Sequence, residues 1–223
     1  MPRYQEFLTE LESYADEDYK SFHKRLLKND DINVLGVRVP ILRKLAKKYK
    51  GETDEFMSFP DEYYEVTFVK LSIVSLLPYE QFLKYLDRCL PLIDNWAVCD
   101  CFIPECIAAH KDEFLKLPPI YAAVNAEFYQ RFALTSLLHY YVEEKYLSTV
   151  FKILTQVDTS YYYVHMAAAW LIAEVLVKCY ESCVEFLGSG VMDKKTHNKA
   201  IQKACESFRL SNEQKNFLKG IKR

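Results

Sequence analysis

The sequence is poor in residues that break helices, and it has no long apolar run. Only five glycines and eight prolines are spread over 223 residues, which is sparse for an all-β or loop-rich protein and suits helices with short connections. No apolar stretch reaches the roughly 18 residues that a membrane span needs. The first residues, MPRYQEFLTELESY, carry acids where a signal peptide would be hydrophobic. We therefore expect a soluble cytoplasmic protein with no membrane partner.

The cysteines and histidines lack the spacing of a metal site. The seven cysteines are an odd number and form no C-x-x-C pair, and none of the five histidines lies at zinc-finger spacing. Cysteines in an intracellular chain commonly act as small buried hydrophobic residues. We therefore expect neither a metal nor another cofactor.

Charge is distributed unevenly along a chain whose net charge is −2. Residues 1–50 carry +3, residues 51–190 carry −11 and residues 191–223 carry +6. The low total argues against a nucleic-acid partner, but phosphate contacts need only local lysines and arginines. The two basic ends indicate a basic surface if they flank one face. They are equally consistent with an ordinary solvated surface at each end.

Apolar residues recur with a helical period along nearly the whole chain. The pattern predicts an all-α fold of about a dozen helices. The predicted helical segments cover residues 4–14, 16–28, 61–77, 79–90, 95–110, 111–117, 126–142, 143–157, 161–179, 180–189, 193–207 and 211–221. Within residues 35–51 we expect a further helix that follows a turn at Gly36, has Pro40 in its first turn and ends at Gly51. No linker-like stretch separates them, so we expect a single domain over residues 1–223.

Corresponding points of these helices recur at a nearly constant interval. Trp96 and Arg131 are 35 residues apart, and Arg131 and Trp170 are 39 residues apart. Degenerate helix pairs at such spacing are typical of a HEAT-like repeat α-solenoid, whose curvature creates a concave binding face.

Polar residues and a glycine mark some of the boundaries. Asp16 or Asp18 is expected near the N-terminus of the second helix, and Gly36 is expected in a turn. Asp94 or Asn95 is placed to cap the helix that begins at residue 95.

An acid interrupts an otherwise apolar helix in the segment IDNWAVCDCF. Asp100 follows Trp96 by four residues, so the two side chains share a helix face. Burying a lone carboxylate costs several kcal/mol. Asp100 therefore has a partner, for which Arg131 is the natural candidate, or it faces a cleft. The alternative interpretation is purely structural, with the ion pair and the tryptophans in the core.

The order of these motifs resembles the bacterial AlkD-type DNA alkylation repair proteins, HEAT-like DNA glycosylases that excise cationic alkylated purines. The matching segments run in family order from about residue 30 to 208, and they are LGVRVPILRKLAK, NWAVCD, FYQRFA, HMAAAWLIAE and NKAIQKACES. The resemblance implies that Asp100 is the catalytic carboxylate and that Trp96 and Trp170 flank the deoxyribose of the lesion. It implies that Arg131 supports the site and contacts the DNA backbone.

The resemblance also implies double-stranded, alkylated DNA as the partner and no deep pocket for the base. Three features of the chain differ from the family pattern, and one of them is the tyrosine-rich segment SYYYVH. Ala173 stands where the family has an arginine after the second tryptophan. The active enzymes carry an aromatic residue on an N-terminal helix, and either Tyr19 or Phe22 is its counterpart here.

Basic residues near both ends are the predicted phosphate contacts. They are Arg38, Arg43, Lys44, Lys47, Lys194, Lys195, Lys199 and Lys203. Three hypotheses follow for a protein that we expect to be monomeric. It is an alkylpurine DNA glycosylase, a non-catalytic HEAT-like relative that binds duplex DNA by its shape or damage, or a protein-interaction scaffold.

Overall fold

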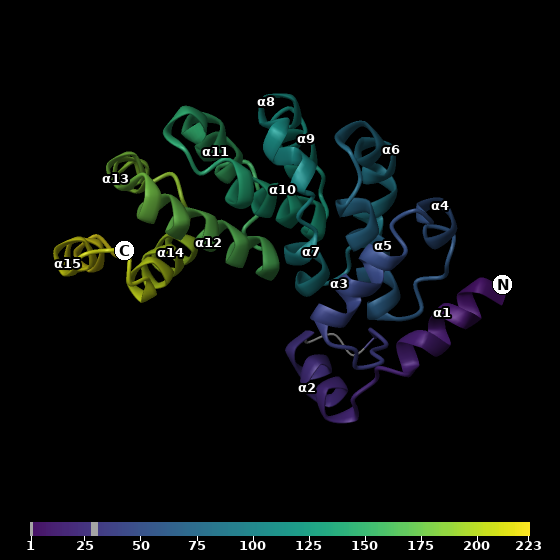
Figure 1. The fold of residues 1–223 in the computed structure, drawn as a ribbon. Helices are drawn as coiled ribbons and strands as arrows, with labels where there is room; N and C mark the ends of the chain where they lie inside the picture. Colours follow the sequence, from purple (N-terminus) through teal and green to yellow (C-terminus); the bar gives the residue numbers. More distant parts are fainter. Residues whose placement is uncertain (1, 28–30) are drawn as a thin grey trace. The chain divides into compact units, whose positions relative to one another are not determined.

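The computed structural model describes residues 2–27 and 31–223 (Figure 1). These residues form helices joined by loops, and no strand occurs among them, so the predicted all-α fold is confirmed. No helix in this described part is long and apolar enough to cross a membrane. The chain divides into two compact units, Met1–Ala109 and His110–Arg223, which we call the N-terminal and the C-terminal unit. The single domain, the solenoid and its concave face stay predictions.

The helices of the N-terminal unit are mostly short. They are α1 (Pro2–Glu12), α2 (Glu17–Leu27), α3 (Val39–Lys48), α4 (Thr53–Phe56), α5 (Tyr64–Ser75), α6 (Tyr79–Cys89), the 3₁₀ helix η1 (Leu90–Leu92), α7 (Trp96–Cys101) and the 3₁₀ helix η2 (Glu105–Ala109). Helix α5 is buried along most of its length and packs against α3, α6 and α7. It therefore forms the core against which α3, α4, α6 and α7 pack.

A buried carboxylate organises the segment that leads into α3. Glu65 of α5 is fully buried and accepts hydrogen bonds from the three backbone N–H groups of residues 35–37, at 2.8 to 3.2 Å. Gly36 has a φ of 96°, and a Cβ there would lie 2.5 Å from the carbonyl oxygen of Asp16. Gly36 lies in a loop that has no assigned turn, and its positive φ and close approach to Asp16 suit only glycine. Asp16 also accepts a hydrogen bond from the backbone N–H of Tyr19 at 2.9 Å and so caps α2.

The helix predicted over residues 95–110 is interrupted. Helix α7 ends at Cys101, and η2 begins only at Glu105. Pro104 lacks a backbone N–H and disfavours a helical conformation at the residue before it, so the chain leaves the helix here. Helices α4 and α9 (Pro118–Ala122) were not predicted, because four or five residues are too few to show a helical period. The predicted helix end at Lys28 lies outside the described residues.

The C-terminal unit contains longer helices. They are α8 (Lys111–Phe114), α9, α10 (Glu127–Tyr140), the 3₁₀ helix η3 (Glu144–Tyr146), α11 (Leu147–Leu154), α12 (Tyr162–Lys178), α13 (Tyr180–Gly188), α14 (Lys194–Glu206) and α15 (Asn212–Gly220). Helix α12 packs between α10 and α14 (Figure 1).

Contacts between these helices join residues that are about one repeat apart. Glu127 on α10 accepts a hydrogen bond from the backbone N–H of Tyr163, 36 residues later, on α12. His165 on α12 contacts the hydroxyl of Thr196, 31 residues later, on α14. Equivalent helices of successive repeats produce this register, which supports the predicted HEAT-like solenoid.

Candidate DNA-binding and catalytic site

Helix α7 is only six residues long and depends on its N-cap. The side-chain oxygen of Asn95 accepts a hydrogen bond from the backbone N–H of Val98 at 2.9 Å, and Asn95 is only 2% exposed. The Asn95 amide in turn donates to Asp94 at 2.7 Å. The sequence allowed either residue as the cap, and the structure assigns this role to Asn95, with Asp94 as its support. The cap fixes the turn that carries Trp96 and Asp100.

Trp96 joins α7 to α2. Its indole N–H donates to the backbone carbonyl of Leu26, in the last turn of α2, at 3.2 Å. Trp96 and Asp100 are both half-buried, one turn apart on the same side of α7. A carboxylate and an indole are therefore accessible together in the N-terminal unit, and the hydrogen bond to Leu26 restrains the position of the indole.

The two aromatic residues of α2 have different surroundings. Tyr19 stacks on His23, with 5.5 Å between the ring centroids, and lies 4.7 Å from the guanidinium carbon of Arg38. Arg38 also forms a salt bridge with Asp16 at 2.9 Å. Phe22 is 49% exposed. Phe22 therefore offers the more accessible ring to a ligand, whereas Tyr19 and Arg38 are engaged with each other.

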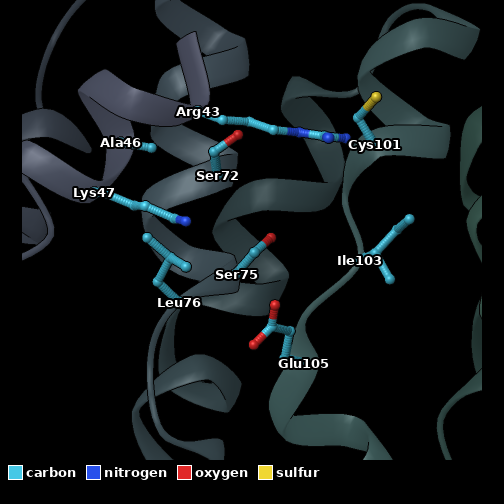
Figure 2. Close-up of a pocket in the computed structure, with 9 residues that line it drawn as sticks. All are labelled: Arg43, Ala46, Lys47, Ser72, Ser75, Leu76, Cys101, Ile103 and Glu105. Carbon is cyan, nitrogen blue, oxygen red and sulfur yellow. The ribbon is translucent and has the colours of Figure 1, made fainter. Parts of the chain in front are cut away.

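A pocket of about 390 Å³ lies beside the end of α7. Figure 2 shows the residues that line it, which are Arg43, Ala46, Lys47, Ser72, Ser75, Leu76, Cys101, Ile103 and Glu105. Arg43 and Lys47 are one turn apart on α3, and both point toward the pocket (Figure 2). Burial raises the pKa of the Cys101 thiol, and the charge of Arg43 opposes this shift.

The pocket brings together two of the predicted phosphate contacts. Arg43 and Lys47 supply positive charge, which Glu105 partly offsets, and Ser72 of the neighbouring α5 supplies a hydroxyl group that the sequence did not indicate. The hydroxyl of Ser75 donates to the backbone carbonyl of Leu71 at 2.9 Å. Cations with nearby hydroxyls form the kind of site that binds phosphate oxygens. Lys44, also predicted, is exposed on α3 but does not line the pocket.

Arg131 is anchored inside the C-terminal unit. It is 5% exposed, and its Nη1 donates to the backbone carbonyl of Tyr163 at 2.7 Å. The guanidinium carbon lies 5.8 Å from the centre of the Tyr163 ring. Arg131 therefore ties α10 to the first turn of α12. The pairing of Arg131 with Asp100 stays a prediction.

Trp170 lies two turns further along α12 and is half-buried. Its ring meets His139 of α10 edge-on, at a centroid distance of 6.3 Å. Trp170 also lines a pocket of about 290 Å³ together with Lys203 and Arg209. Arg209 donates two hydrogen bonds to Glu174, at 2.7 and 2.9 Å, which lower the pKa of that carboxyl.

The other predicted lysines lie on α14. Lys195 and Lys199 line a pocket of about 510 Å³ against α12, and Lys194 is exposed at the first position of the helix. Tyr162 lines the same pocket and was missed by the sequence analysis. Its spacing of two helical turns from Trp170 was the available signal. Among residues 2–27 and 31–223, no cluster of three or more histidine, cysteine or acidic side chains is arranged to hold a metal ion.

Comparison with known families identifies the chain. The family model described as DNA alkylation repair enzyme matches residues 7–208, which include Trp96, Asp100, Arg131 and Trp170. The comparison with curated proteins gave no match. Because the matched segment covers most of the sequence, the chain belongs to the DNA alkylation repair enzyme family.

Proposed function

We propose that the protein excises cationic N3- or N7-alkylated purines from double-stranded DNA by hydrolysing the N-glycosidic bond. Its family supports a role in DNA alkylation repair. The observation that carries the glycosylase proposal is the pair on α7. A half-buried carboxylate, Asp100, and a half-buried indole, Trp96, share one face of a capped helix beside a pocket with two cations.

The residue types suit this reaction. Alkylation at N3 or N7 makes the purine positively charged and weakens its bond to the sugar. When the bond breaks, its electron pair neutralises the departing purine and leaves an oxocarbenium-like sugar. The Asp100 carboxylate stabilises that cation, and the electron-rich face of Trp96 attracts it. Water then adds to C1′ and loses a proton, which gives an abasic site and the free alkylated base.

A single carboxylate is sufficient for this substrate class. The leaving group already carries a positive charge, so it needs little help from a general acid. The proposal therefore requires no second acid of raised pKa, which most glycoside hydrolases use. It also predicts poor activity on undamaged or neutral bases, whose departure would need protonation.

The basic residues are assigned to the DNA backbone. Arg43 and Lys47 bind phosphate together with Ser72 in the N-terminal unit. In the C-terminal unit we assign Lys194, Lys195, Lys199 and Lys203 to phosphates. Lys44 and Arg38 are secondary contacts, and Arg38 must first leave its salt bridge with Asp16.

Arg131 and Trp170 have proposed roles in the C-terminal unit. Arg131 holds the Tyr163 carbonyl at the start of α12, and on the basis of the family membership we assign it the support of the site and a contact to the DNA backbone. Trp170 supplies a second indole face for the sugar of the lesion. Its position beside Lys203 supports this assignment.

The proposal is tested by the release of methylated bases from alkylated duplex DNA. Asp100→Asn keeps the size and the acceptor oxygen of the side chain but removes its charge. We expect this variant to release bases at least about 100-fold more slowly than the wild type, because the charge that stabilises the transition state is lost. We expect it to bind duplex DNA as tightly as the wild type does. Asp94→Asn is the matched control, because asparagine retains an acceptor oxygen for Asn95. Wild-type activity in Asp100→Asn would contradict the assignment.

A second candidate function is DNA binding without excision. The cationic pockets favour it, because the lysines on α14 and the pair on α3 bind phosphate without any need for Asp100. This candidate predicts salt-sensitive duplex binding and no base release by the wild type. The family assignment favours DNA over the protein partner of the third hypothesis.

A further inference from the structure

The pocket between α12 and α14 has the charge of an anion-binding site. The residues that line it are Tyr162, His165, Met166, Lys195, Asn198, Lys199, Gln202 and Lys222. Two of its lysines come from α14 and the third, Lys222, from the segment that follows α15. None of these lining residues is acidic. Three cations around one hollow of about 510 Å³ favour an anionic ligand.

An accessible aromatic ring forms part of the same pocket. Three consecutive tyrosines lie at the start of α12, Tyr161 as its N-cap and Tyr162 and Tyr163 in its first turn. The ring of Tyr162 meets that of Tyr163 edge-on, with 5.1 Å between the ring centroids. Tyr161 donates to Asn125 at 3.2 Å, and the ring of Tyr163 lies 5.4 Å from that of Phe128. Tyr162 is 51% exposed and lines the pocket. Its ring therefore has a surface available to a ligand.

A buried histidine, His165, also lines the pocket. His165 is 3% exposed, and its Nδ1 lies 2.9 Å from the hydroxyl of Thr196. Burial lowers the pKa of His165, the charges of Lys195 and Lys199 lower it further, and the charge of Asp193 opposes this shift. His165 therefore contributes an uncharged polar group to the lining of the pocket, and the lysines supply the positive charge.

The combination of lysines and an exposed ring distinguishes between two forms of DNA. Duplex DNA presents its phosphates to a protein but keeps the faces of its bases stacked, so phosphate binding alone has no use for Tyr162. Proteins that bind single strands combine positive charge with aromatic rings on which unstacked bases lie. We infer that this pocket binds one unpaired nucleotide of a DNA strand, with its base on Tyr162 and its phosphate at Lys195, Lys199 and Lys222. The inference rests on the proposed function for its ligand, DNA, but not on base excision.

The experiment measures fluorescence anisotropy of the full chain with a labelled short oligodeoxythymidylate and, separately, with a continuous duplex. We expect Tyr162→Ala to bind the single strand about tenfold more weakly, the effect of losing one stacked base, and to bind the duplex like the wild type. Tyr162→Phe keeps the ring and restores binding of the single strand. Lys199→Gln weakens single-strand binding and reduces its salt dependence by about 0.7 in slope.

Two control variants remove similar groups outside the pocket. Phe208→Ala removes a fully exposed ring, and Lys152→Gln removes an exposed lysine of α11. Both should bind like the wild type. The inference is overturned if Tyr162→Ala binds the single strand as tightly as the wild type, or if it loses affinity equally for both DNAs.

The outcome is separable from that of the proposed function. Unmodified DNA serves as the probe, so an absence of base release by the wild type leaves this test intact. Base release by a wild type that does not bind the single strand would overturn only the unpaired-nucleotide site.

Discussion

The N-cap of α7 provides the sharpest test of how the sequence positions the candidate site. Asn95→Ala removes the oxygen that accepts from the Val98 N–H. Val98 is 1% exposed and Asn95 is 2% exposed, so water cannot readily replace the lost acceptor. Helix α7 has six residues, fewer than an isolated helix needs for stability, and therefore depends on such contacts.

The expected cost follows from two contributions. Loss of an N-cap side chain costs about 1 kcal/mol, and a buried backbone N–H left without a partner costs about 1–3 kcal/mol. The two costs are not added, because both describe the loss of the same hydrogen bond between Val98 and Asn95. We expect Asn95→Ala to lower the free energy of unfolding by about 2–3 kcal/mol.

The assay is urea denaturation followed by far-ultraviolet circular dichroism, with base release measured in parallel below the unfolding transition. Asn95→Ser is the control, because serine provides an acceptor oxygen at the same position and should lose less than half as much stability. Base release should fall in Asn95→Ala even where the protein is folded, because the turn with Trp96 and Asp100 loses its anchor. An Asn95→Ala variant within about 0.5 kcal/mol of the wild type would refute the reasoning, since that is the range of ordinary surface substitutions.

Three further predictions concern buried or paired ionisable groups, each measured by urea denaturation. Burial lowers the pKa of His23 below 6.5, and its Nε2 has no partner among the described residues. As the pH falls, the imidazole is therefore protonated in the unfolded chain before it is in the folded protein, so the free energy of unfolding decreases below about pH 6.5. His23→Phe should remove this contribution to the pH dependence of stability. An unchanged pH dependence in His23→Phe would contradict the prediction. Glu65→Gln should cost about 2–3 kcal/mol, because an NH₂ group would face backbone donors; a loss below about 0.5 kcal/mol would count against this role. Glu174→Gln should cost at most about 1 kcal/mol at pH 7, because Arg209 is largely exposed. The pKa of Glu174 is lowered, so its contribution to stability is present above pH 4.5 and lost as the pH falls through the folded pKa; a stability difference between Glu174→Gln and the wild type that does not shrink as the pH falls below 4.5 would argue against the ion pair.

The sequence predicted the helices well because their apolar faces are periodic. It did not resolve where α7 ends, although Pro104 was a visible signal, since the apolar pattern continues across it. It also left Asp94 and Asn95 as equal candidates for the cap. Burial decides between them, and burial depends on how α7 packs against α5.

The hydrogen-bond partner of Arg131 could not be predicted from the sequence. The sequence suggests a carboxylate as its partner, because side-chain patterns reveal charges. The structure shows that one of its N–H groups donates to the backbone carbonyl of Tyr163. Every residue has such a carbonyl, so no side-chain pattern marks this one as the acceptor. The exposure of Phe22 and Tyr162 likewise becomes visible only when the helices around them are in place.

The most direct test of the proposed glycosylase activity is the rate at which the wild-type protein releases 3-methyladenine and 7-methylguanine from methylated duplex DNA. We predict release well above the spontaneous rate, with an abasic site formed for each base released. Release at the spontaneous rate, in samples where the protein binds the duplex, would contradict the proposed glycosylase activity and favour DNA binding without excision.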